Sequence, residues 1–314
     1  MLTNQITDTA YYVFRLLSSK GIGPAKARQI MEISRNNGIP LYELFQKIDD
    51  NRLLPEVIMK YAEPLKSIGQ QLFETWDKLI DNEIKSVCYN EKEYPQRLSD
   101  ALGDKAPIIL FYKGNIEILK KPSIGFCGSR KASEKGLETA RDCTYQMVNR
   151  GANIVSGYAH GVDMATHVTA LESGGTTTLV LAEGLLHFKL KNELSHVYDS
   201  DRTLVISEFL PGVPWSVRNA MQRNATICGL SSLTILIEAQ EKGGSFDAGK
   251  KCLAMGRPLF APVYEGMPES ATGNRILLEQ GALKLMRSKK TGKAHMQQIS
   301  DFLFGGKLPL TLNK

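Results

Sequence analysis

The sequence predicts an α/β protein with a Rossmann-like, doubly wound and mostly parallel sheet, preceded by a small helical domain. Two observations support this prediction. From about residue 105 onward, short apolar runs alternate with stretches long enough to form helices, which is typical of parallel strands joined by helical crossovers. Several of these runs also end in glycine or serine, where a chain can turn from a strand into a helix and place backbone N–H groups around a ligand.

The composition is that of an ordinary globular protein. A length of 314 residues allows a large core and more than one domain. No run of about 18 apolar residues predicts a membrane-spanning helix. The first residues lack the basic and apolar regions of a secretory signal, so we expect a cytoplasmic protein with no membrane partner. The five cysteines are scattered and form no C-x-x-C pair, which argues against disulfides and a zinc site.

Residues 1–85 are expected to form a helical N-terminal domain. A stretch with helical periodicity ends near Leu17, and a second begins at Pro24, which suits the first position of a helix. Between them, Gly21 and Gly23 predict a tight turn. This pattern resembles a helix-hairpin-helix, whose turn amides commonly hold a nucleic-acid phosphate. The alternative is a plain turn between two packed helices.

Residues 86–287 are expected to form the Rossmann-like domain. Its first part, around 94–114, is interpreted as a connection. The expected strands and helices then alternate along the chain. The strands are 123–127, 153–155, 177–181, 203–206, 233–237 and 258–263, and the helices are 134–150, 161–173, 215–229 and 246–255.

Residues 288–314 are expected to form a basic and flexible C-terminal tail. The net charge of +6 arises in residues 284–314, where seven basic residues accompany Asp301 alone. Such a tail is either a solvated end or an arm that binds nucleic acid or a protein partner. Because the rest of the chain is balanced in charge, the net charge alone does not indicate a nucleic-acid-binding protein.

The turn after the first expected strand has the residues needed to bind phosphate. Gly128 lets the backbone approach a ligand, Ser129 offers a hydroxyl, and Arg130 offers a forked pair of donors. No G-x-G-x-x-G fingerprint and no G-x-x-x-x-G-K-[ST] loop occur in the chain. We therefore expect no nucleotide cofactor of the NAD or FAD type and no ATP hydrolysis of the P-loop type.

Two groups of polar residues are candidates for catalytic or metal-binding sites. His160, Asp163 and His167 are spaced to lie near one face of a helix, but without a fourth ligand they make a poor zinc site, and bracing of a turn is the better interpretation. Glu183, Glu208 and Glu238 lie at the ends of expected strands without forming an acid–base pair. We therefore expect no metal and no catalytic residues.

Taken in order, the motifs resemble those of the DNA-processing protein A (DprA/Smf) family. They are Gly128-Ser129-Arg130, Ser156-Gly157, Gly161-Val162-Asp163, His167, Thr178-Leu179-Val180-Leu181, Gly184-Leu185, Ser207-Glu208, Arg223-Asn224, Gly229-Leu230-Ser231, Gly244-Ser245, Gly256-Arg257 and Gly281-Ala282. The resemblance implies a non-enzymatic, homodimeric protein that binds and protects single-stranded DNA. It also implies that the protein loads the RecA recombinase during DNA uptake in natural transformation.

The resemblance also implies that Ser129 and Arg130 contact the DNA strand and that Arg223, Asn224, Gly244 and Ser245 line the same groove. The full set of residues that we predict to bind DNA or phosphate is Gly128, Ser129, Arg130, Gly157, His160, Lys189, Lys191, Arg218, Arg223, Asn224, Gly243, Gly244 and Ser245. Where the family has an aromatic-proline pair and a second arginine, this chain has Ala220-Met221 and Ala225. Trp215 and the neighbouring cations are candidates to compensate for these changes.

An alternative from another class is a protein on the same scaffold that binds nucleotides or cleaves the N-glycosidic bond of nucleoside monophosphates. Lys242-Gly243-Gly244-Ser245 is similar to the glycine-rich loop of such phosphoribohydrolases, but Phe246-Asp247-Ala248 stand where those enzymes have paired glutamates. A third interpretation is a structural adaptor with a vestigial groove. Release of free base from a monophosphate distinguishes the enzyme from the other two.

Overall fold

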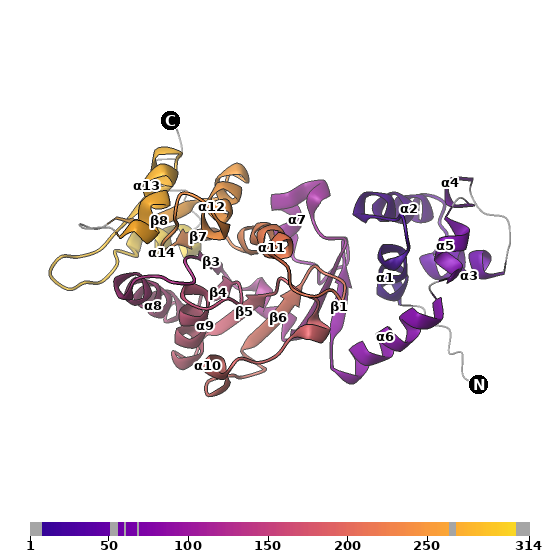
Figure 1. Ribbon diagram of the computed structural model, residues 1–314, viewed down its shortest axis with the longest axis horizontal. Helices are drawn as coiled ribbons and strands as arrows, with labels where there is room; N and C mark the ends of the chain where they lie inside the picture. Colours follow the sequence, from indigo (N-terminus) through magenta and orange to yellow (C-terminus); the bar gives the residue numbers. More distant parts are fainter. Residues whose placement is uncertain (1–7, 51–55, 60, 68, 264–267, 306–314) are drawn as a thin grey trace.

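The computed structural model describes residues 8–50, 56–59, 61–67, 69–263 and 268–305. Within these ranges, nine strands form one sheet in the order β1-β2-β6-β5-β4-β3-β7-β8-β9 (Figure 1). The strands from β3 to β9 pair in parallel, whereas β2 is antiparallel to both β1 and β6. The predicted Rossmann-like fold is confirmed. The strand bounds are β1 (Lys85–Cys88), β2 (Ile109–Gly114), β3 (Ser123–Cys127), β4 (Asn153–Ser156), β5 (Thr176–Val180), β6 (Thr203–Ser207), β7 (Leu233–Leu236), β8 (Leu259–Val263) and β9 (Leu283–Met286).

Helices cover both faces of the sheet. In the view of Figure 1, α8 (Glu134–Val148), α9 (Val162–Glu172) and α10 (Asn192–Ser195) lie below it. On the upper side lie α7 (Gln96–Leu102), α11 (Val217–Leu230), α12 (Gly244–Ala254) and α13 (Thr272–Glu279). The central strands are buried along their whole length, as expected for a sheet covered on both faces. No helix among the described residues is long and apolar enough to cross a membrane.

The strand order determines where the loops at the carboxyl ends of the strands meet. From β3, the chain continues to β4 on one side, whereas β7, the neighbour on the other side, is reached only after β4, β5 and β6. In doubly wound sheets, the carboxyl ends of two strands that diverge in this way leave a crevice that binds ligands. The loops that follow β3, β4 and β7 therefore meet at one crevice.

The N-terminal segment contains only helices within its described residues. They are α1 (Thr9–Ser18), α2 (Pro24–Asn36), α3 (Leu41–Asp49), α4 (Glu56–Met59), α5 (Ala62–Ser67) and α6 (Gly69–Asp81). A buried arginine joins three of them. The Arg15 guanidinium donates to both carboxylate oxygens of Asp49 at 3.1 and 2.7 Å and to the Leu65 carbonyl at 2.9 Å, and it lies over the Phe45 ring. This network fixes how α1, α3 and α5 pack.

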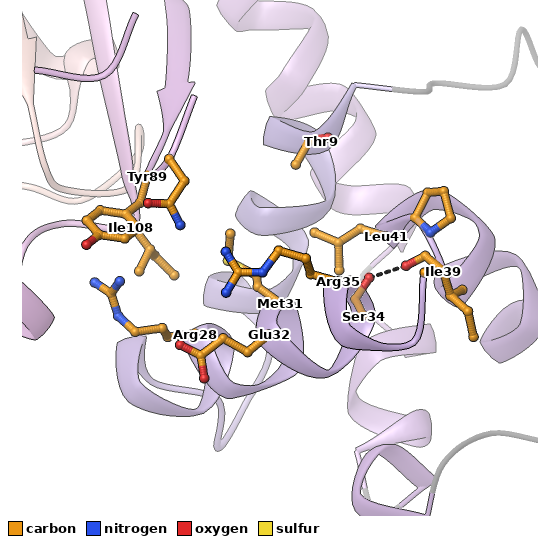
Figure 2. A pocket seen from close by; sticks show the side chains of 13 residues that line it. Thr9, Arg28, Met31, Glu32, Ser34, Arg35, Ile39, Leu41, Tyr89 and Ile108 are labelled. Atoms are coloured by element: carbon orange, nitrogen blue, oxygen red, sulfur yellow. Dashed lines mark hydrogen bonds between the residues drawn. The ribbon is translucent and has the colours of Figure 1, made fainter. Parts of the chain in front are cut away.

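The helical segment packs against the edge of the sheet formed by β1 and β2. Phe14 meets Phe111 edge to face, with 6.0 Å between the ring centroids, and Arg28 donates to the Ala106 carbonyl at 2.8 Å. Between α2 and this edge is a mainly apolar hollow of about 320 Å³ (Figure 2), lined from both sides by residues that include Met31, Leu41 and Ile108. The two parts therefore share one hydrophobic core.

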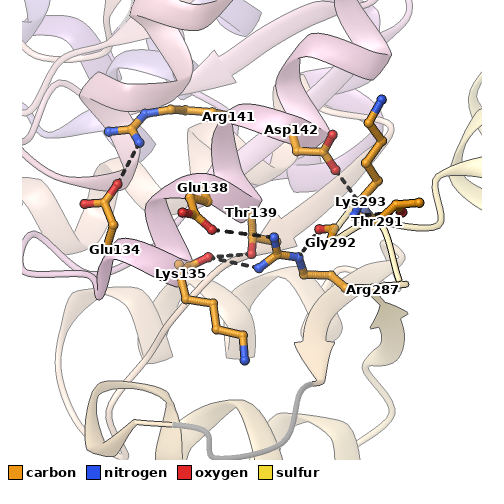
Figure 3. A network of polar contacts seen from close by, with 12 residues as sticks. Glu134, Lys135, Glu138, Thr139, Arg141, Asp142, Arg287, Thr291, Gly292 and Lys293 are labelled. Carbon is orange, nitrogen blue, oxygen red and sulfur yellow. Dashed lines mark hydrogen bonds and ion pairs between the residues drawn. The ribbon is translucent and has the colours of Figure 1, made fainter. Parts of the chain in front are cut away.

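The chain after β9 does not behave as the flexible tail that we expected. Ala294, Met296 and Ile299 are buried, the last of them on α14 (Gln297–Gly305). Figure 3 shows how the preceding loop is held against α8: the Arg287 guanidinium donates to the Gly292 and Lys135 carbonyls at 2.7 and 3.3 Å. Residues 288–305 pack on the domain because their apolar side chains extend its core, and residues 306–314 lie outside the described part.

Candidate functional site

Two adjoining hollows open at the carboxyl edge of the sheet. The large hollow, of about 440 Å³, is lined by the loops after β3 and β7, by α11 and by the beginning of α12. The small hollow, of about 340 Å³, is lined by the loops after β4 and β5. Arg130, Ala159, Trp215 and Arg223 line both. The two hollows are therefore parts of one continuous groove.

The loop after β3 is held by close backbone packing. Gly161 has a φ of +76°, and a Cβ at this position would overlap the Ser129 carbonyl oxygen, which accepts from the Val162 N–H at 3.3 Å. The Ser129 hydroxyl in turn accepts from the Lys131 N–H at 3.0 Å. The loop is thus fixed on the start of α9, while the Arg130 side chain is exposed and lines both hollows. A fixed loop with a projecting guanidinium suits a phosphate.

The amino end of α12 forms another part of the large hollow. Gly243 has a φ of +107°, and it lines the hollow together with Gly244 and Ser245. The buried Asn224 side chain donates to the Gly244 carbonyl at 2.9 Å and so orients this turn. An eleven-residue helix carries a partial positive charge at its amino end, which favours an anion in the hollow.

Arg223 lies at the junction of the two hollows, and its burial was not apparent from the sequence. Only 6% of the residue is exposed, and a Cβ at Gly157 would overlap its Nη1. Nη1 lies 4.0 Å from Asp163 Oδ2, but neither Nε nor Nη1 has a hydrogen-bond partner in the described structure. Buried donors are normally paired, so unpaired donors at the wall of a groove indicate a site for an acceptor from a ligand.

Asp163 and His167 brace the turn beneath Arg223, which agrees with the structural interpretation of these residues. Asp163 accepts from the Ser156 hydroxyl at 3.0 Å and from the Ala159 N–H at 3.2 Å. The buried His167 ring has Nε2 2.6 Å from the Gly157 carbonyl and Nδ1 2.6 Å from Thr177 Oγ1. Burial lowers the pKa of His167 to about 4, so the ring is neutral at pH 7 and Nε2 carries its proton.

The small hollow contains cations that are partly engaged in local contacts. Lys191 donates from Nζ to the Tyr158 carbonyl at 2.5 Å and lies over the Tyr158 ring, and burial lowers its pKa. His160 Nδ1 lies 2.9 Å from Glu193 Oε1. Lys189 is exposed at the rim. Lys189 is therefore exposed to a ligand, whereas Lys191 and His160 must exchange existing partners.

Three carboxylates near the groove make structural contacts. Glu238 accepts from the Ser133 N–H at 2.9 Å and from the Ser270 hydroxyl at 2.8 Å. These bonds link the start of α8 to Ser270, which lines the large hollow. Asp247 forms an ion pair with Lys251 at 2.7 Å. Burial raises the pKa of Glu208, and its Oε2 accepts from the Thr226 hydroxyl at 2.6 Å. These contacts give each group a role in holding the fold.

The structure brings together eleven of the thirteen residues predicted for the site. Gly157 and Arg218 line neither hollow: Gly157 lies beneath Arg223, and Arg218 is exposed on α11. Two lysines that were not predicted, Lys131 and Lys242, also line the large hollow. Each is adjacent in sequence to a predicted loop, and this adjacency was the available signal.

Comparison with known proteins agrees with this architecture. The sequence matches the model of a family described as DNA recombination-mediator protein A over residues 85–295. DNA processing protein DprA of Streptococcus pneumoniae (strain ATCC BAA-255 / R6) is 35% identical over 196 residues, which are 62% of this chain and 68% of that protein.

Two solved structures are similar in fold. The X-ray structure of DprA from Streptococcus pneumoniae has a TM-score of 0.71 at 27% identity, covering 88% of this chain and 95% of that one. A structure of DNA processing protein A from Helicobacter pylori has a TM-score of 0.56 at 22% identity, covering 70% of this chain and 94% of that one. That structure was solved to describe the single-stranded DNA binding mode of the Helicobacter pylori protein. The family model matches two thirds of the sequence, and the resemblance seen in the motifs is confirmed: the chain belongs to the DNA recombination-mediator protein A (DprA/Smf) family.

Proposed function

We propose that the groove binds single-stranded DNA by its phosphates. The observation that carries this proposal is the convergence of unpaired Arg223 donors, the exposed Arg130 and the amino end of α12 on one groove. A cationic groove that follows the backbone is the usual means of binding single strands without sequence preference. Lys131 and Lys242 extend the cationic wall in the large hollow, and Lys189 extends it in the small one.

Family membership supports a more specific role. We propose that the protein acts as a homodimer in the cytoplasm, protects single-stranded DNA and loads it with the RecA recombinase, as in natural transformation. The helical segment 1–85 is then an adaptor beside the 86–287 domain, with 288–314 as a basic extension. In the turn that resembles a helix-hairpin-helix, the Ile22 N–H already donates to the Ser19 carbonyl and Lys26 donates to the Gly21 carbonyl, so we assign DNA binding to the groove.

Replacing Arg130 by alanine is expected to weaken binding of a single-stranded oligonucleotide about tenfold, the size of one charge-assisted hydrogen bond. Each lost phosphate contact on a single strand should also lower the slope of log K against log salt by about 0.7. Titrations by fluorescence anisotropy at several salt concentrations measure both quantities.

The matched control is Arg141→Ala, because Arg141 is a half-exposed arginine on α8 that pairs with Glu134 and lines neither hollow. A second comparison replaces Lys289, Lys290 and Lys293 together. If that triple variant loses binding while Arg130→Ala keeps the affinity and salt slope of the wild type, the DNA contact is at the C-terminal segment and the groove proposal is wrong.

We also propose that the protein is not an enzyme. Asp247, which stands where phosphoribohydrolases have an acid, is held by Lys251. Incubation with nucleoside monophosphates is therefore expected to release no free base above a blank, as measured by chromatography. Release that Asp247→Asn abolishes would establish the nucleotide-cleaving alternative instead.

A further inference from the structure

An exposed tryptophan stands at the junction of the two hollows. Trp215 is 49% exposed and lines both hollows, and the Arg130 guanidinium lies 5.7 Å from the centre of its ring. Val217 beside it is 67% exposed. Exposed aromatic surface at the centre of a cationic groove contributes little to folding, so it indicates a surface that a ligand covers.

The loop that carries Trp215 is firmly anchored. It joins β6 to α11, and its Pro211 and Val213 carbonyls accept from the Leu186 and Gly184 N–H groups at 3.1 and 2.8 Å. A Cβ at Gly184 would overlap the Leu210 carbonyl oxygen, so the two loops touch directly. On the other side of Trp215, Ser216 caps α11 by accepting from the Asn219 N–H at 3.0 Å. An aromatic ring on an anchored loop is already placed for binding, so little ordering entropy is lost when a ligand covers it.

Cations lie on both sides of this ring. Lys131 and Lys242 line the large hollow, and Lys189 and Lys191 line the small one. A strand whose phosphates contact both groups must pass the indole between them. Because every base has a π-face, a base at this point can stack whatever its identity, provided that it is not paired in a duplex.

We propose that Trp215 is a stacking platform for one base of the bound strand, and that it makes the groove select single-stranded over duplex DNA. This inference rests on the proposed function of the groove. Arg130 and Trp215 then form one recognition unit, in which the guanidinium binds a phosphate and the adjacent indole holds a base. The duplex is rejected because its bases are stacked on one another and cannot offer a free face to the indole.

The chain allows a direct optical test. It contains two tryptophans, and Trp76 is buried in the helical segment against Tyr11 and Phe14. In a Trp76→Phe protein, Trp215 is the only indole reporter. Oligothymidylate is expected to quench its fluorescence. An oligomer of the same length built from abasic nucleotides is expected to bind through its phosphates with little quenching.

The affinity of variants provides the second readout. Trp215→Ala is expected to weaken oligothymidylate binding about five- to 150-fold, the range for loss of one stacked base, and Trp215→Phe to recover most of it. Binding of the abasic oligomer should change less than about twofold, since its phosphate contacts persist. The matched control is Tyr145→Ala, because Tyr145 is 54% exposed and lines neither hollow.

The outcomes separate this inference from the proposed function. If Trp215→Ala weakens both oligomers equally, or if oligothymidylate binds without quenching Trp215, the stacking role is wrong while DNA binding stands. If Trp215→Ala leaves the preference for single strand over duplex unchanged, the selection role is wrong. If the wild-type protein binds neither oligomer, the proposed function fails, and this inference fails with it.

Discussion

Replacing Arg223 by methionine is expected to weaken single-strand DNA binding by about 2–5 kcal/mol, which is roughly thirty- to several-thousand-fold. This is the largest effect on binding that the groove allows. Arg223 is buried, and its Nε and Nη1 have no hydrogen-bond partner among the residues described. A phosphate that reaches these donors gains charge-assisted bonds in a place from which water is excluded, where such bonds are strongest.

The same variant is expected to stay folded. Two effects on stability oppose each other: the variant loses the 4.0 Å pair with Asp163, and it no longer buries unpaired donors. The bonds from Ser156 and Ala159 to Asp163 do not involve Arg223 and continue to brace the turn. Methionine also fills much of the space next to Gly157 that the arginine side chain occupies, so a large cavity is avoided.

Anisotropy titrations and urea unfolding of the same samples test this expectation. Arg223→Lys is the informative companion variant, because lysine keeps the charge but cannot offer two parallel donors. Its DNA affinity should lie between those of the wild type and Arg223→Met. Asp163→Asn checks whether the negative charge of Asp163 affects DNA affinity or stability. Wild-type affinity in a folded Arg223→Met protein would show that the buried guanidinium has only a structural role.

The central sheet could be predicted because its strands are buried on both faces and alternate with helices. The expected strand 123–127 and β3 (Ser123–Cys127) coincide. Four other expected strands differ from the observed ones by one residue at one end, and the expected strand 177–181 is shifted by one residue from β5 (Thr176–Val180). A fully buried strand is a mainly apolar run that ends in small residues. This pattern can be recognised in the sequence without knowing which strands pair with it. The same loops that ended these runs proved to line the groove.

The strands at the two edges of the sheet were not predicted. β2 falls in the stretch 94–114 that we interpreted as a connection, whereas β1 and β9 were not recognised. β1 and β9 have only four residues each, and β2 pairs antiparallel, outside the strand–helix alternation that identified the other strands. Their pairing depends on partners that are distant in sequence, for example Phe111 of β2 opposite Ser207 of β6.

The site was predictable only at the level of its loops. Residues that follow strands came together because parallel strands end at one edge, as Gly128 and Gly244 show. The burial of the Arg223 side chain was not predictable, because it depends on how Gly157, Asp163 and α11 pack together. Arg218 lies on the same helix as Arg223 but is exposed outside both hollows, a difference that sequence spacing alone did not reveal.

Lowering the pH from about 6.5 towards 4 is expected to cost the protein about 3 kcal/mol of unfolding free energy through His167 alone. Burial lowers the pKa of this histidine to about 4 in the folded protein, whereas the unfolded chain titrates near 6.5. Between these values the unfolded state binds more protons, so stability rises with pH across this window. The contribution is fully present above pH 6.5 and is lost as the pH falls.

The contribution of His167 must be measured against a variant, because burial also shifts the pKa values of carboxyl groups. Burial raises the pKa values of Glu183, Glu208 and Glu91, and these groups shift stability in the opposite direction. His167→Gln is the matched control, since its amide can donate to the Gly157 carbonyl but cannot gain a charge. Urea unfolding of both proteins from pH 7 to pH 4.5 should show the wild type losing stability faster than the variant. Parallel profiles would contradict the prediction, because they would show that protonation of the buried His167 ring does not contribute to the loss of stability at low pH.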